Sequence, residues 1–144
     1  MKLAIGSDHG GLNLKNSLVE FLKAGGHEVS DEGTFDCESC DYPVFAKRVA
    51  NKVASGECDF GVLVCTSGVG MAITANKVKN VRAVNAHNEY EAEMSRRHNN
   101  CNVICFGEKQ VSFDLAAKCV EIFLSTPFEG GRHTRRVEMF EDNE

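Results

Sequence analysis

The chain has 144 residues, of which 42% are hydrophobic, and this suits a single globular domain covering residues 1–144. Its formal charge of −5 excludes the broad basic surface that nucleic-acid binding requires. No apolar run approaches the roughly 20 residues of a membrane-spanning helix, so we expect a soluble, cytoplasmic protein without a membrane partner.

Strands and helices alternate along the whole chain. The predicted strands cover residues 2–6, 27–31, 59–64, 81–86 and 102–106, and the predicted helices cover 12–24, a segment beginning at 41–43, 71–78, 89–97, a segment around 115–123, and 132–140. Repeated strand–helix units require parallel pairing with right-handed crossovers. The predicted fold is an α/β, doubly wound, three-layer sandwich of the Rossmann-like or flavodoxin-like kind, with a five-stranded parallel sheet and a C-terminal helix.

Cys65 stands where the third predicted strand ends and a glycine-rich turn (residues 66–70, TSGVG) opens a helix. Free backbone N–H groups and the positive end of the helix dipole stabilise a thiolate at such a place, and they also bind anions and oxyanions. This pattern indicates a reaction centre.

Further polar side chains follow other strands. Asp8 and His9 come after the first strand and His87 after the fourth. Because ligands gather at the carboxyl ends of parallel strands, these residues are expected on the same edge as Cys65. The alternative for Asp8 is a plain capping residue of the next helix, a role that can coexist with function.

Arg132 and Arg136 are four residues apart, so on a helix they share one face and could bind two oxygens of a phosphate. The alternative is a solvated face. His98 closes the helix after the fourth strand, about 15 Å from the carboxyl edge for a ten-residue helix. It is therefore either a surface residue or a residue that completes a site in a second subunit.

Several familiar loops are excluded by spacing. A Walker A loop requires Gly-Lys, but Met71 follows Gly70. The dinucleotide fingerprint lacks its third glycine, and a low-molecular-weight phosphatase loop would place arginine where Met71 stands. What remains is a thiol suited to moving a proton next to a carbonyl or to forming a covalent adduct.

The seven cysteines form an odd set, and we expect reduced thiols. Cys37 and Cys40 form a C-x-x-C pair in a polar loop, with no second pair at zinc-finger spacing, so a metal or redox role is the minor alternative. The remaining cysteines outside the glycine-rich turn are expected to behave as small hydrophobic residues: Cys58, Cys101, Cys105 and Cys119.

Several segments together resemble the ribose-5-phosphate isomerase B and galactose-6-phosphate isomerase family over essentially the whole chain. They are residues 6–11 (GSDHGG), 41–43 (DYP), 65–70 (CTSGVG), 75–77 (ANK), 95–99 (SRRHN) and 129–133 (EGGRH) with Arg136. The resemblance implies a metal-free aldose–ketose isomerase without a cofactor, acting on a sugar phosphate through a cis-enediolate.

The resemblance also implies roles for individual residues. Cys65 matches the base that carries a proton between C2 and C1, Asp8 a residue at the sugar hydroxyls, and His98 a ring-opening residue supplied by the neighbouring subunit of a homodimer. The matching substrate contacts are His9, Tyr42, Thr66, Ser67, Gly68, Val69, Gly70, Asn99, Lys109, Arg132 and Arg136. One branch of the family uses a glutamate where this chain has Met71, which leaves Cys65 as the candidate base.

Two departures concern the substrate. Thr66 stands where many relatives have glycine, so its side chain could crowd the site or require another backbone angle, and Lys109 replaces an arginine. Ribose 5-phosphate is the expected substrate, and allose, galactose or tetrose phosphates are the alternatives. A non-catalytic sugar-phosphate-binding module and a tetramer also stay open.

Overall fold

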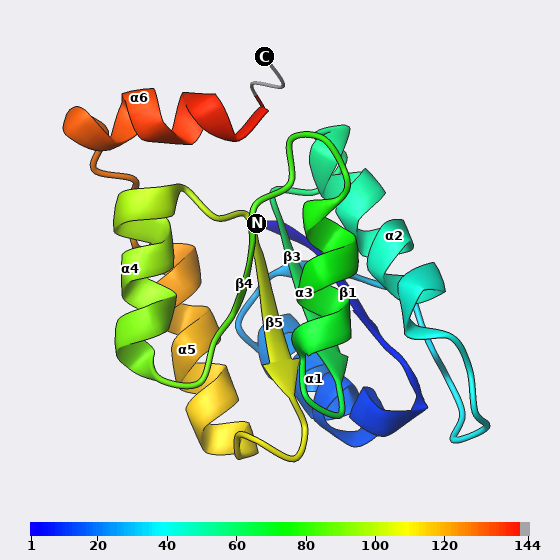
Figure 1. The fold of residues 1–144 in the computed structure, drawn as a ribbon. Helices are drawn as coiled ribbons and strands as arrows, with labels where there is room; N and C mark the ends of the chain where they lie inside the picture. The colour runs from blue at the N-terminus through cyan, green and yellow to red at the C-terminus, as the bar shows by residue number, and fades with distance from the viewer. Residues whose placement is uncertain (142–144) are drawn as a thin grey trace.

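A five-stranded, all-parallel sheet forms the centre of the molecule (Figure 1). The structure is a computed structural model that describes residues 1–141. The strands lie in the order β2-β1-β3-β5-β4 and comprise β1 (Lys2–Ser7), β2 (Glu28–Asp31), β3 (Phe60–Cys65), β4 (Ala83–Asn85) and β5 (Val103–Gly107). This architecture confirms the predicted α/β fold.

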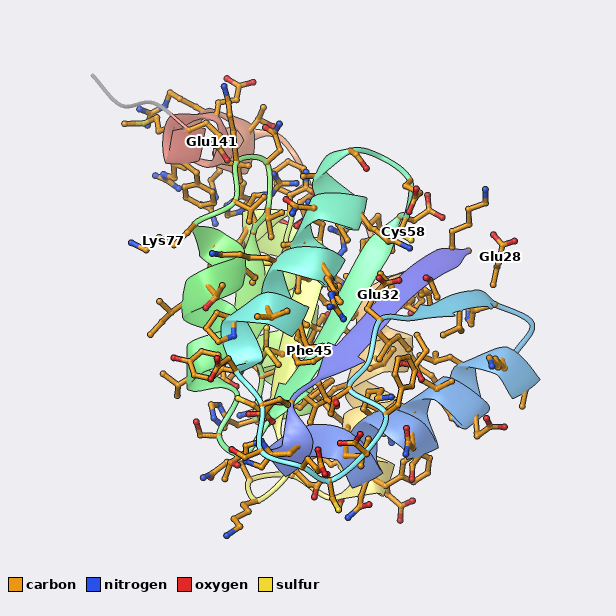
Figure 2. The ribbon with its side chains drawn as sticks, turned by 90° about the vertical axis from the view of Figure 1, so that its right-hand side faces the viewer. Glu28, Glu32, Phe45, Cys58, Lys77 and Glu141 are labelled. Carbon is orange, nitrogen blue, oxygen red and sulfur yellow. The ribbon has the colours of Figure 1, made fainter. Side chains whose placement is uncertain are left out.

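Helices cover both faces of the sheet. They are α1 (Leu12–Ala24), α2 (Tyr42–Ala54), α3 (Val69–Asn76), α4 (Glu89–Asn99), α5 (Phe113–Ser125) and α6 (Arg132–Glu138), with short 3-10 turns at His9–Gly11 and Met139–Glu141. One hydrophobic core lies under α1, α4 and α5, and the other lies under α2 and α3. Figure 2 views the α2 side, with Phe45 on the helix and Cys58 just before β3.

Successive residues of β1 serve the two cores in turn. Leu3 and Ile5 enter the first core, and Ala4 enters the second. Strands buried on both faces produce the continuous apolar runs from which they were predicted. Across the described residues, no helix is long and apolar enough to cross a membrane.

Helix α4 has a highly charged sequence, but it buries Ser95 and Arg96. The Arg96 guanidinium donates to the carbonyls of Thr126 at 3.1 Å and Cys101 at 2.6 Å, and it lies 5.0 Å from the centre of the Phe60 ring. Burial lowers the pKa of Arg96. This side chain ties the end of α4 to the end of α5.

A buried ion pair holds the segment after β2 against the end of β1. Lys15 is fully buried, and its Nζ donates to both carboxylate oxygens of Asp31 at 2.9 Å. Asp31 also accepts the Gly33 N–H at 3.0 Å. Gly33 and Thr34 then pair with the backbone of Ser7, at 2.7 and 2.8 Å. The ion pair thus shapes the carboxyl edge of the sheet.

All seven cysteines carry free thiols. Cys58, Cys101, Cys105 and Cys119 are buried, which confirms their predicted role as small hydrophobic residues. Burial raises the pKa of Cys101 and of Cys119 to about 11, because it disfavours the thiolate.

Replacing Asp31 by asparagine should lower the free energy of unfolding by about 2–3 kcal/mol, since the buried Lys15 ammonium loses its counter-charge. The partial exposure of Asp31 keeps this below the value for a fully buried pair. The double variant Lys15→Met/Asp31→Asn should recover part of the loss. Urea unfolding measures both effects, and an Asp31→Asn variant as stable as the wild type would contradict the assignment.

Iodoacetamide at neutral pH should label Cys37 in the native protein well before Cys101 or Cys119, because Cys37 is exposed and the other two have raised pKa values. Peptide mass spectrometry after timed labelling gives the order. The three thiols should react at similar rates in urea, which serves as the control. Rapid native labelling of Cys101 would show that its surroundings open to solvent.

Candidate functional site

The end of β3 opens onto a hollow of about 410 Å³. Its lining comes from the ends of β1 and β3 and the starts of α2 and α3, namely Asp8, Tyr42, Cys65, Thr66, Ser67, Val69, Gly70 and Ile73. Hollows of 610 and 860 Å³ lie elsewhere, but neither contains Cys65 or Asp8. The positions of Cys65 and Asp8 therefore make the 410 Å³ hollow the candidate site.

Cys65 is held at the floor of this hollow with 6% of its surface exposed. Its Sγ accepts a hydrogen bond from the Gly68 N–H at 3.1 Å. Gly68 has φ +83°, a conformation that favours glycine, and it caps α3. Because Gly68 caps the helix, α3 begins at Val69 and not at residue 71 as predicted. Cys65 therefore precedes the helix by a short turn and is bonded to the turn's own amide.

The glycine-rich turn is packed too closely for added side chains. A Cβ on Gly107 would come within 2.6 Å of the Ser67 backbone, and a Cβ on Gly70 would collide with the Tyr42 ring. A Cβ on Gly10 would collide with Thr66 Oγ1. Sequence patterns marked Gly10 and Gly70 only as parts of motifs and did not mark Gly107, whereas the structure shows that each of the three makes room for a neighbouring segment.

Thr66 does not adopt the left-handed conformation that favours glycine, since the non-glycine residues with positive φ in the described chain are Asn80 and Asn100. Threonine therefore needs no glycine-type backbone angle at this position. Its hydroxyl packs beside Gly10, and the residue also lines the hollow. Thr66 can thus contact a ligand without straining the turn.

Asp8 both caps a turn and lies on the same edge of the sheet as Cys65. Its Oδ1 accepts the Gly10 N–H at 2.9 Å, so it caps the 3-10 turn at His9–Gly11, and it is 7% exposed where it lines the hollow. His9 is exposed, and its Nδ1 accepts the Cys40 N–H at 3.2 Å. The loop that carries the C-x-x-C pair therefore lies against His9.

Lys109 lies on the same edge of the sheet, because its N–H donates to the Thr66 carbonyl at 3.2 Å. His87 follows β4, where its N–H donates to Glu91 at 2.7 Å, and it does not line the hollow. Asn85 was missed by sequence reasoning. It donates to the Ser67 carbonyl at 3.4 Å and lies against Gly68, so it supports the turn from β4.

Four predicted site residues lie at the other end of the sheet. His98 and Asn99 end α4, and Arg132 and Arg136 share the exposed side of α6. Figure 1 shows the end of α4 and the whole of α6 at the opposite end of the sheet from the end of β3. One chain therefore presents two separate groups of candidate residues, as the length of α4 indicated for His98.

Two further residues at that second end carried no assigned role from sequence. His133 is 9% exposed and stacks on His98, with ring centres 4.3 Å apart, and Glu129 Oε1 lies 3.5 Å from His133 Nε2. Burial and the neighbouring charges of His98, Arg132 and Arg136 lower the pKa of His133, while Glu129 opposes this shift. The signal that could have found them was their place in the family segment 129–133 (EGGRH), which begins with Glu129 and ends with His133.

Known proteins resemble this chain over nearly its whole length. Ribose-5-phosphate isomerase B of Escherichia coli is 47% identical over 137 residues, which are 95% of this chain and 92% of that protein. A ribose-5-phosphate isomerase B structure from Clostridium thermocellum superposes with a TM-score of 0.97 at 49% identity, covering 99% of this chain and 96% of the other.

A structure of ribose-5-phosphate isomerase B from Mycoplasma genitalium with bound ribulose-5-phosphate superposes with a TM-score of 0.94 at 41% identity, covering 97% of this chain and 93% of the other. The model of the Ribose/Galactose Isomerase family matches residues 3–140. The fold, the glycine-rich turn with its thiol and these likenesses lead to one conclusion: the chain belongs to the ribose/galactose isomerase family.

Proposed function

We propose that this protein is an aldose–ketose isomerase that interconverts D-ribose 5-phosphate and D-ribulose 5-phosphate through a cis-enediolate. The observation that carries the proposal is the Cys65 thiol at the floor of a hollow that it shares with Asp8. Relatives named for this reaction, and a relative with ribulose-5-phosphate bound, support the choice of substrate.

In the proposed mechanism the Cys65 thiolate removes the proton from C2 and returns it to C1. Negative charge then develops on the substrate oxygens, and the backbone N–H groups of Ser67 and Gly70 in the turn are suited to stabilise it. Asp8 assists the movement of a proton between O1 and O2. The Gly68 N–H donates to Sγ and so fixes the position of the sulfur at the start of the turn. No metal or cofactor has a step in this scheme.

The second group of residues reaches the site from a neighbouring subunit in this proposal. His98 then acts on the furanose ring, while Arg132 and Arg136 join His9 at the phosphate and Asn99 contacts the sugar. An isologous dimer supplies each half of the site twice, which fits two groups that lie at opposite ends of one sheet. We propose such a homodimer of single-domain chains, working in the cytoplasm, where thiols stay reduced.

Phosphates of longer sugars form the second candidate substrate class. The family's description includes galactose, and Thr66 lines the hollow in this chain. Lys109 keeps a positive charge at the same edge but lacks the two-pronged geometry of arginine. Both side chains lie where they could alter the preferred sugar length without changing the proton transfer.

Cys65→Ala should lower kcat/KM for ribose 5-phosphate by about 100-fold or more, because the base is lost. Solvent deuterium should also cease to enter the ketose at C1. Cys58→Ala is the matched control, since Cys58 is a thiol of equal 6% exposure away from the hollow. A panel with allose 6-phosphate and galactose 6-phosphate tests the substrate, and better turnover of a hexose would overturn that choice.

Mixing equal amounts of Cys65→Ala and His98→Ala chains under exchange conditions should restore about one quarter of the wild-type activity. Half of the dimers are then mixed, and one of the two sites in each mixed dimer has both intact residues. Each variant mixed with itself provides the background. If no activity returns although mass spectrometry detects mixed dimers, His98 does not complete a neighbour's site.

A further inference from the structure

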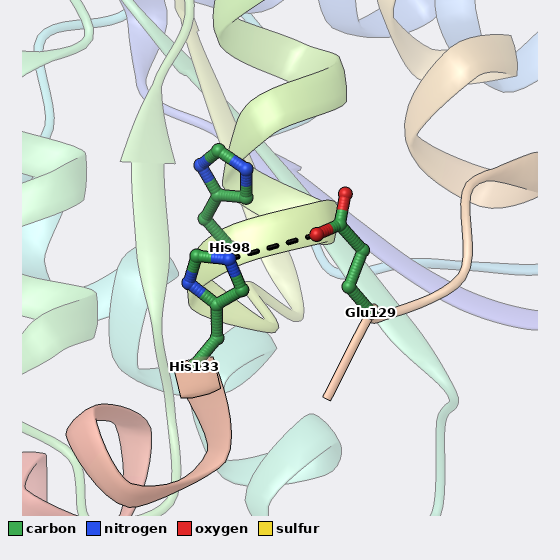
Figure 3. A group of neighbouring side chains, drawn as sticks. All are labelled: His98, Glu129 and His133. Carbon is green, nitrogen blue, oxygen red and sulfur yellow. Dashed lines mark ion pairs between the residues drawn. The ribbon is translucent and has the colours of Figure 1, made fainter. Parts of the chain in front are cut away.

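His98, Glu129 and His133 form a compact cluster outside the hollow (Figure 3). The His98 and His133 rings lie within 14° of parallel, with their centres 4.3 Å apart. His133 comes from α6, and Glu129 comes from the loop before it. Two adjoining segments, α6 and the loop before it, therefore meet α4 at the side chain of His98.

A metal ion is one conceivable occupant, since the ligand atoms of the three side chains lie within 4.8 Å of one another. An imidazole nitrogen, however, directs its lone pair in the plane of the ring. Two stacked, nearly parallel rings keep those lone pairs in separate planes, so no single ion at about 2.0–2.1 Å from both nitrogens lies in both planes. The stack favours a packing role over metal binding.

The loop before α6 anchors His133 from two sides. The Glu129 N–H donates to the carbonyl of Arg97 at 3.1 Å, and its carboxylate lies 3.5 Å from Arg97 Nη1. The His133 N–H donates to the Gly130 carbonyl at 3.0 Å. His133 is thus fixed relative to the residue that immediately precedes His98.

The His133 ring is suited to lie against another imidazole. Burial lowers the pKa of His133, which favours the uncharged form of its ring. Its Nε2 is buried without a hydrogen bond, although it faces Glu129. The His133 ring therefore covers one face of the His98 ring without a hydrogen bond that would turn it elsewhere.

We propose that His133 is a positioning residue that holds the His98 imidazole in the orientation needed for ring opening, with Glu129 fixing His133 in turn. This rests on the proposed function, in which His98 acts on the furanose. Ring opening breaks the bond between C1 and the ring oxygen, while a proton leaves the C1 hydroxyl and a proton reaches the ring oxygen. An imidazole can do both only if its nitrogens are correctly aimed.

The proposal separates two steps of the reaction. Ribose 5-phosphate enters as a ring, whereas ribulose 5-phosphate has no free hydroxyl placed to close a five-membered ring. Exchange of solvent deuterium into C1 of ribulose 5-phosphate therefore needs Cys65 but no ring opening. A residue that acts only through His98 should affect the first reaction and spare the second.

His133→Ala should lower kcat/KM for ribose 5-phosphate by about 10- to 100-fold, the cost expected of a misplaced catalytic group. Deuterium exchange into ribulose 5-phosphate should stay within about twofold of wild type, because the proton-transfer residues are untouched. His133→Phe keeps a flat ring against His98 and should restore most of the lost activity. Arg135→Ala, an exposed neighbour on α6, is the control and should match wild type.

Three outcomes would overturn this role. Equal losses in both reactions would mean that His133 supports the whole site, and no loss in either would mean that the stack is incidental. A single tight Zn²⁺ site in wild type that His133→Ala removes would favour the metal alternative. If His133→Ala fails to fold, His133→Leu, which keeps bulk but removes the flat ring, supplies the same comparison. Wild type that turns over no ribose 5-phosphate would instead refute the proposed function itself.

Discussion

In an all-parallel sheet, every strand ends at one edge and every crossover helix must carry the chain back to the other. This constraint governs the distribution of the chemistry in this protein. Cys65 ends β3 at the carboxyl edge, and His98 lies near the end of α4 at the amino edge. No local adjustment brings the two together in one chain. The separation follows from the topology, and the proposed pairing of two subunits is the arrangement that reconciles it with a single reaction.

The same constraint explains why the thiol is held rigidly. β3 pairs with β1 on one side and β5 on the other, so Cys65 emerges from the centre of the sheet. The turn that follows is confined by neighbouring segments, with Gly107 beneath Ser67 and Gly10 beside Thr66. A turn packed in this way keeps its amides aimed without reorganisation, which is the condition for effective electrostatic stabilisation.

Patterns of apolar residues predicted the layers well, because each helix buries one continuous face and the central strands bury both of theirs. Helix α1 begins and ends where predicted, since Gly25 and Gly26 stop it and Leu18 lies on its buried face. The end of the third predicted strand placed Cys65 at the carboxyl edge, and the length of the helix before His98 placed that residue at the opposite edge. The start of α3 did not, because the left-handed conformation of Gly68 is a backbone property that hydrophobic periodicity cannot register.

What escaped prediction consists mostly of charged groups that the fold buries. Lys15 and Arg96 appear in helices whose other charged residues face solvent, and no periodicity marks them as internal. Their burial depends on partners distant in sequence, Asp31 for one and backbone carbonyls for the other. The stacking of His98 on His133 has the same origin, since two histidines 35 positions apart meet only after α6 has docked.

The division of candidate residues between two ends of the sheet has an evolutionary consequence. If each site takes its thiol from one copy and its imidazole from another, a duplicated gene need not preserve both halves in both products. One product could lose the thiol and the other the imidazole, and a mixed assembly would still contain one intact site. Such a pair could no longer be separated, so complementary decay would turn a homo-oligomer into an obligate hetero-oligomer without any gain in activity.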